Sequence, residues 1–94
     1  MKITAQVRLN MERGDSSDLG SAWVEIEDCI KFPVKLRVYR DQDGTEKWFV
    51  SYPQRRTEGG YAPIVYPHDK ELRQEIHNAV SEAMGQSILK GIGN

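Results

Sequence analysis

The chain has 94 residues, of which 38% are hydrophobic, and its 13 lysines and arginines against 14 aspartates and glutamates give a formal net charge of −1. This length allows one small domain, residues 1–94, and the charge argues against a surface that is basic throughout. No apolar run approaches the roughly 20 residues of a membrane span. Cys29 is the single cysteine, which excludes an internal disulfide and a cysteine-based zinc site. The N-terminal segment has no apolar leader, so we expect a cytoplasmic protein.

Alternating residues predict three half-buried strands in the first part of the chain. Over residues 2–11, 22–27 and 31–39, apolar side chains occupy nearly every second position, with polar or charged side chains between them. This period is typical of a strand with one face on a core and one toward solvent. Segments rich in Gly, Ser and Asp separate the strands, and Asp43-Gly44 is a hairpin signal before the next one.

A fourth strand, residues 47–52, is apolar on both of its faces. Trp48 and Val50 point one way and Phe49 the other. A strand buried on both faces in so short a protein needs cover from a helix, a loop or another subunit. We therefore expect a homodimer, which would also help a small core, because small domains bury a smaller share of their surface.

The rest of the chain predicts a polar loop, a short extended piece and one helix. Residues 54–60 form the loop, and residues 61–67 contain two prolines that keep them out of a central ladder. Asp69 can cap a helix, and apolar residues then recur at spacings of three and four. Gly85 either frays or ends the helix, and residues 85–94 either extend its apolar stripe briefly or form a flexible tail. The expected fold class is α+β: an antiparallel, curved sheet of about four to five strands with one C-terminal helix.

No constellation of residues indicates catalysis or metal binding. The serines lack a nucleophile-elbow motif, and His68 and His77 are nine positions apart, too far to share a helical face as metal ligands. We interpret Cys29 as a small turn residue rather than as the partner of His68 in a dyad. Asp41 to Gly44 fits a plain turn better than a calcium loop. We expect no enzyme activity, no cofactor, no metal and no small-molecule substrate.

The outward face of the second and third strands carries Lys31, Lys35 and Arg37. Matching the apolar faces of the two strands sets Glu25 and Glu27 beside these cations. Opposite charges across two strands stabilise a sheet by about 0.2–1 kcal/mol per pair. We therefore favour a solvated, salt-paired face, with a nucleic-acid surface as the alternative.

The segment Gln54-Arg55-Arg56-Thr57 is the candidate binding site. Two adjacent guanidiniums, an amide and a hydroxyl stand with only Glu58 to offset their charge, and two glycines follow. Arginine suits phosphate oxygens and base edges, and the neutral side chains add hydrogen bonds. On an extended segment Arg55 and Arg56 would point to opposite sides, whereas a bent loop would let both face one groove.

Residues 49–61 resemble the signature of the SpoVG family, the septation regulators also called stage V sporulation protein G. In that family an apolar strand ends in Pro, a Ser/Gln-Lys/Arg-Lys/Arg-Thr segment follows, and a Gly precedes an aromatic residue, as in residues 53–61 here. Weaker matches extend the resemblance over roughly residues 2–84. The chain departs from the family at Tyr66, where a His is usual, and at Glu58, where a Pro is common. Residues 85–94 contain no acidic residue and so do not match the acidic tail common in the family.

This resemblance implies a small cytoplasmic homodimer that binds DNA or RNA and affects transcription, septation or sporulation. Carried over by position, the nucleic-acid-binding residues are Gln54, Arg55, Arg56 and Thr57, with Arg73 near the helix start as an addition. The alternative is a protein–protein adaptor of cell division or sporulation that binds no nucleic acid directly. In that case the arginine loop and Trp23 would meet an acidic partner protein.

Overall fold

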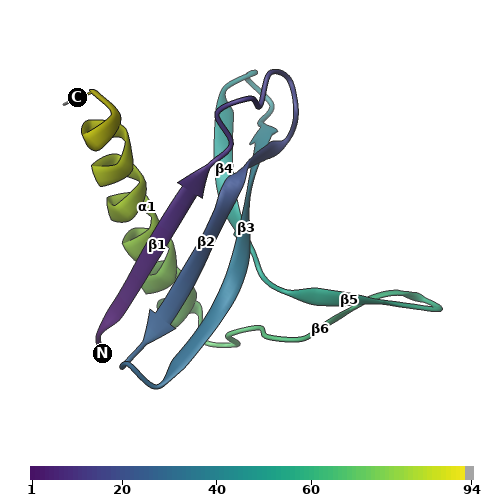
Figure 1. Cartoon of the computed structure of the whole chain (residues 1–94). Helices are drawn as coiled ribbons and strands as arrows, with labels where there is room; N and C mark the ends of the chain where they lie inside the picture. Colours follow the sequence, from purple (N-terminus) through teal and green to yellow (C-terminus); the bar gives the residue numbers. More distant parts are fainter. Residues whose placement is uncertain (93–94) are drawn as a thin grey trace.

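The computed structural model describes residues 1–92, which form a four-stranded antiparallel sheet, a separate β-hairpin and one helix. The sheet contains β1 (Ile3–Leu9), β2 (Asp18–Ile26), β3 (Ile30–Arg40) and β4 (Glu46–Ser51), each hydrogen-bonded to its neighbour in the chain. The helix crosses one face of this sheet, and no described element covers the other face (Figure 1). The predicted α+β class, with an antiparallel sheet and one C-terminal helix, is confirmed.

The hydrophobic core lies between the sheet and the helix α1 (Lys70–Ile92). Its buried members are Ala22, Val24, Phe32, Val34, Leu36, Ile76 and Val80. The register sets the apolar residues of β2 directly across from those of β3, so both sets face the helix together. Ile76 and Val80 come from successive turns of α1 and are fully buried. Burying one large apolar side chain contributes about 1.5–3 kcal/mol, so this cluster is the main source of stability.

The helix begins as predicted and extends beyond Gly85. The Asp69 carboxylate accepts a hydrogen bond from the backbone N–H of Glu71 at 3.1 Å, which confirms the predicted cap. The helix continues past Gly85 to Ile92, so of the alternatives that the sequence leaves open for the residues after Gly85, the structure adopts the helical extension. Glycine weakens a helix by about 1 kcal/mol but ends it only where the backbone turns left-handed, and Gly85 does not. Residues 93–94, the end of the predicted tail, lie outside the described residues. Within residues 1–92, no helix is long and apolar enough to cross a membrane.

Residues 54–60, predicted as a loop, instead begin a second sheet. β5 (Gln54–Thr57) pairs with β6 (Gly60–Pro63) in an antiparallel hairpin that extends away from the main sheet and the helix (Figure 1). Gly60 has a φ of 132°, which glycine adopts without strain where the chain leaves the turn. The loop prediction is wrong because this hairpin is formed by backbone pairing and has no apolar face that would give its strands a sequence period.

Candidate nucleic-acid interface

The hairpin of β5 and β6, residues 54–63, is called the arm below. It exposes the predicted binding segment, residues 54–57, to solvent. Gln54, Arg55 and Arg56 are exposed, and Thr57, next to the turn, is half-buried. Among the ion pairs of residues 1–92, none includes either guanidinium. Both arginines therefore keep their charge and their five donors available for an external anion.

Hydrogen bonds fix the base of the arm to the body of the protein. The Pro53 carbonyl accepts hydrogen bonds from the backbone N–H groups of Ile64 at 2.9 Å and Val65 at 3.3 Å. Just outside this closure, the rings of Tyr52 and Tyr66 meet edge to face, with their centres 5.6 Å apart. The arm therefore leaves the body in a defined direction.

The pairing of β5 with β6 sorts the two arginines onto opposite faces of the arm. Arg56 stands opposite Tyr61, and Arg55 stands opposite Ala62. Because side chains alternate along a strand, Gln54 shares a face with Arg56 and not with Arg55. Of the two alternatives that the sequence leaves open, the structure adopts the extended one. The two guanidiniums of one chain therefore cannot grip the same phosphate.

Arg73, the fifth predicted binding residue, lies apart from the arm. Its guanidinium donates hydrogen bonds to the carbonyl oxygens of Pro67 at 2.9 Å and His68 at 3.0 Å. It also lies 5.3 Å from the centre of the Tyr66 ring. Arg73 lines a cavity between β4 and α1, together with Gln74. These contacts hold the segment that leads into α1, so the structure does not join Arg73 to the residues of the arm.

The register leaves Lys35 without the acidic neighbour that we expected. Glu25 stands across from Lys31, whereas Lys35 stands across from Ser21 on β2 and Ser51 on β4. The prediction that glutamates of β2 flank all the cations of β3 is therefore wrong for Lys35. No ion pair within residues 1–92 includes a cation of β3. The outward-facing cations of β3 therefore lack a paired carboxylate within the described residues.

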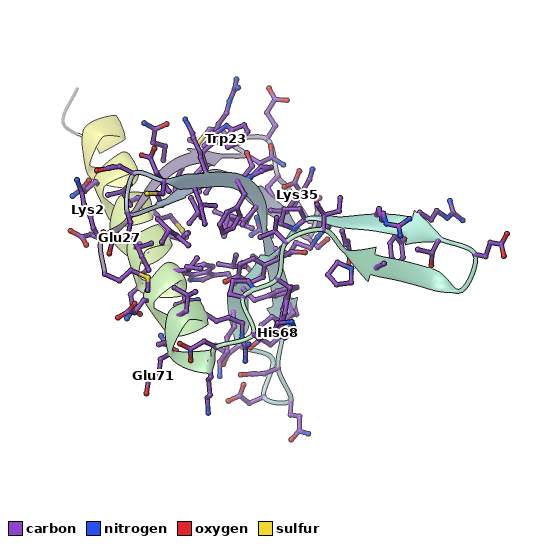
Figure 2. The ribbon with its side chains drawn as sticks, turned by 90° about the horizontal axis from the view of Figure 1, so that it is seen from below. Lys2, Trp23, Glu27, Lys35, His68 and Glu71 are labelled. Atoms are coloured by element: carbon purple, nitrogen blue, oxygen red, sulfur yellow. The ribbon has the colours of Figure 1, made fainter. Side chains whose placement is uncertain are left out.

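Exposed aromatic side chains lie on the same outward face as these cations. Trp23 is 49% exposed, and the Lys31 Nζ lies 5.4 Å from the centre of its ring. Tyr39 and Phe49 are also exposed, with ring centres 5.8 Å apart. Figure 2 shows Trp23 on the side of the sheet away from α1, and Lys35 close to the base of the arm. Cations interspersed with aromatic rings are typical of surfaces that bind nucleic acids.

A cavity of about 390 Å³, the corner cavity, lies where the arm meets the outward face of the sheet. Lys35 and Arg37 of β3 line one side, and Gln54 and Tyr61 of the arm line the other. Tyr52 contributes to its floor, and burial raises the pKa of this phenol above its ordinary value, so it remains neutral at pH 7. Tyr61 is not among the site residues predicted from the sequence, because its position depends on the pairing of β6 with β5.

The cysteine and the two histidines, the other groups considered for chemistry, lie in a turn or pack against aromatic rings. Cys29 is exposed in the turn between β2 and β3. The His77 ring stacks on Trp48 with centres 4.2 Å apart, and the His68 ring meets Tyr66 edge to face at 5.8 Å. In the part of the chain that the structure describes, no three metal-ligating side chains gather at one place.

Comparison with known proteins identifies the family that the sequence resembles. Residues 1–86 match the SpoVG family model, and the chain belongs to the SpoVG family. One relative, the "Putative septation protein SpoVG" of Symbiobacterium thermophilum, is 33% identical over 93 residues, which are 98% of this chain and 63% of the relative. The chain thus spans less than two thirds of that protein's length. No solved structure matches the chain significantly.

Proposed function

We propose that this protein is a small regulatory protein of the septation-regulator type that binds nucleic acid, DNA or RNA, and acts as a dimer. The observation that carries the proposal is the arm, where Arg55 and Arg56 are exposed and take part in no ion pair within residues 1–92. Guanidiniums in this state bind phosphate oxygens through charge-assisted hydrogen bonds. The similarity to a protein described as a septation protein supports the regulatory part of the proposal.

The net charge of −1 does not oppose this function, because the charges are segregated. The outward sheet face and the arm carry the cations Arg8, Lys31, Lys35, Arg37, Lys47, Arg55 and Arg56, of which Lys47 pairs with Asp41 of the neighbouring turn. The acidic residues of the same surfaces are fewer: Asp18, Glu25 and Glu58. Screening at physiological salt limits interactions between exposed charges to about 8–10 Å. A phosphate near the arm therefore experiences mainly the local surplus of cations.

A dimer would double this surface. In a symmetric pair each chain contributes one arm, so two copies of the arginine pair face the ligand. Contacts from two arms can reach phosphates on both sides of a groove or at two places along a strand. The exposed side chains of Phe49 on β4 and Tyr39 on β3 could be buried in such a dimer interface.

The test is fluorescence anisotropy with labelled duplex and single-stranded DNA over a series of salt concentrations. Binding to phosphates releases counterions, so the removal of one phosphate-binding cation reduces the salt slope by about 0.9 for duplex DNA. Replacing both arginines, Arg55→Ala/Arg56→Ala, should lower affinity at least about tenfold and flatten this slope. Because the arm is exposed, the free energy of unfolding should change by less than about 0.5 kcal/mol.

The control, Lys2→Ala/Lys70→Ala, removes two exposed cations elsewhere, of which Lys2 pairs with Asp28 at 3.5 Å, and it should change affinity by about twofold or less. If the double arginine variant binds like the wild type, the arm is not the binding site. Wild-type protein that binds no nucleic acid at any salt concentration would contradict the proposal. Salt-dependent binding of an acidic protein in that case would instead favour the adaptor.

A further inference from the structure

The corner cavity differs in shape from the open surfaces on either side of it. Its two walls come from different sheets, with Pro33 and Lys35 on β3 and Tyr61 on β6. Its volume of about 390 Å³ lies within the range of about 300–1,000 Å³ that is usual for small-ligand sites. A cavity of this size accommodates one nucleotide and is far too small for a double helix.

The wall on β3 supplies positive charge that the rest of the protein does not neutralise. Lys35 faces Ser21 and Ser51 across the sheet, and Asp18 stands across from Arg37. Asp18 forms no ion pair with Arg37, and no ion pair in the described residues includes Lys35. Residues two positions apart on a strand are separated by about 7 Å and share a face. That separation is comparable with the spacing of successive phosphates along an extended single strand.

The wall on the arm supplies an aromatic ring and an amide. Tyr61 is 68% exposed, and among the described aromatic pairs none includes its ring. An open ring of this kind offers a face on which a base can stack, whatever the base. Gln54 lies beside it on the cavity wall, and a Gln amide can both donate to and accept from the edge of a base.

Neither arginine of the arm lines the cavity itself, but only Arg56 lies on the face of the arm that does. Gln54 lines the cavity, and Arg56, two positions further along β5 and opposite Tyr61, lies on the same face of the arm. Arg55 lies on the other face with Ala62. The two adjacent arginines therefore have the same charge, and both are exposed, but they lie on opposite faces of the arm.

From this arrangement, and resting on the proposed nucleic-acid binding, we infer that the corner cavity is a subsite for single-stranded nucleic acid. One unpaired base stacks on Tyr61 beside Gln54, and the phosphates on its two sides contact Lys35 and Arg37 at the sheet and Arg56 on the arm. A base inside a duplex presents its faces to its stacked neighbours, so only an unstacked base can use this wall. An acidic peptide could pair with these cations, but its binding would not require stacking on the Tyr61 ring.

The first part of the test compares a labelled oligothymidylate of about 12 nucleotides, a length within the usual site sizes, with a duplex of the same length. Tyr61→Ala should weaken binding of the single strand about tenfold, since removing the partner of one stacked base has an effect of this order. Binding of the duplex should change less than twofold. Tyr61→Phe keeps the ring and should bind the single strand like the wild type.

The second part uses two matched pairs of variants that remove the same charge from neighbouring positions. Arg56→Ala should weaken binding of the single strand at least about fivefold more than Arg55→Ala does, because only Arg56 shares the face of the arm on which Gln54 and Tyr61 line the cavity. Lys35→Ala should likewise have a larger effect than Lys31→Ala, since Lys31 stands across from Glu25 and outside the cavity. Circular dichroism and melting confirm that each variant is folded.

The outcomes separate this inference from the proposed function. If Arg55→Ala and Arg56→Ala are equal and Tyr61→Ala has no effect, while the double arginine variant no longer binds, the subsite is refuted and nucleic-acid binding stands. Displacement of the oligothymidylate by polyglutamate of equal charge, at equal concentration, would also refute it, because the corner would then act as a charge site alone. If the wild type binds neither oligonucleotide, both proposals fail.

Discussion

At the scale of single residues, Gly20 determines whether β1 and β2 can lie in their observed register. Gly20 has a φ of 151°, and a Cβ added to it would lie 2.3 Å from the carbonyl oxygen of Arg8 and 3.0 Å from the Cα of Leu9. Backbone atoms cannot move aside as a flexible side chain can. We expect Gly20→Ala to lower the free energy of unfolding by at least about 2 kcal/mol, measured by urea denaturation.

Gly59→Ala is the control for this prediction. Gly59 is not in a left-handed conformation, and nothing lies within 4 Å of a Cβ added to it. Its substitution should change the free energy of unfolding by less than about 0.5 kcal/mol. Equal stability of the two variants would show that the contact between Gly20 and β1 does not constrain the fold.

The sequence could not have revealed this role, because it depends on a backbone contact between two strands. The alternation predicts the second strand only from residue 22, but β2 begins at Asp18 with a bulge before Gly20. Similarly, Glu27 and Asp28 have φ values of 54° and 56° in the turn that follows β2. Neither is a glycine, so the turn could be predicted from the break in alternation but not from its residue types.

At the scale of elements, the start of α1 depends on the cap at Asp69. Its side chain accepts the hydrogen bond of the Glu71 N–H, one of the backbone donors that a helix leaves unpaired at its first turn. Asp69→Ala should therefore lower the free energy of unfolding by about 0.5–2 kcal/mol, measured by thermal or urea denaturation. Asp69→Asn keeps an acceptor oxygen and should retain most of the stability. A wild-type melting curve for the alanine variant would contradict this role.

The elements that the sequence predicted well are those with a buried face. The alternation of Val24 and its neighbours, and the helical spacing of Ile76 and Val80, reflect direct packing in the core. The arm has no buried face, so the same reasoning treated residues 54–60 as a loop. The chemistry of Arg55 and Arg56 could be identified from residue type, but their separation onto two faces depends on pairing with β6.

At the scale of the whole molecule, one helix covers one face of the sheet and leaves the other open. The core residues of β2 and β3 point toward α1, and the alternate positions carry cations and aromatic rings outward. The arm then projects from the end of β4 away from the sheet (Figure 1), and the corner cavity lies where the arm meets this open face. The corner could not be predicted, because residues of β3 and β6 meet there through the direction that the chain takes after Pro53.

The same arrangement explains why we expect two chains to associate. β4 lies at an edge of the sheet, and its outward Phe49 is 41% exposed beside Tyr39. An edge strand with exposed apolar side chains pairs readily with another copy of itself, and edge-to-edge pairing leaves the outward face free for a ligand. Static light scattering at micromolar concentration should therefore give twice the chain mass of 10.8 kDa.

A charge at this edge should separate the two chains without unfolding them. Phe49→Lys places an ammonium where the chains would meet, and the exposed position allows the single chain to keep its fold. We expect its mass to fall toward 10.8 kDa while circular dichroism remains unchanged. Ile30→Lys, at the first residue of β3, which is 56% exposed, is the control and should remain dimeric. A wild-type mass of 10.8 kDa at micromolar concentration would contradict dimerisation, and each arm would then bind its ligand alone.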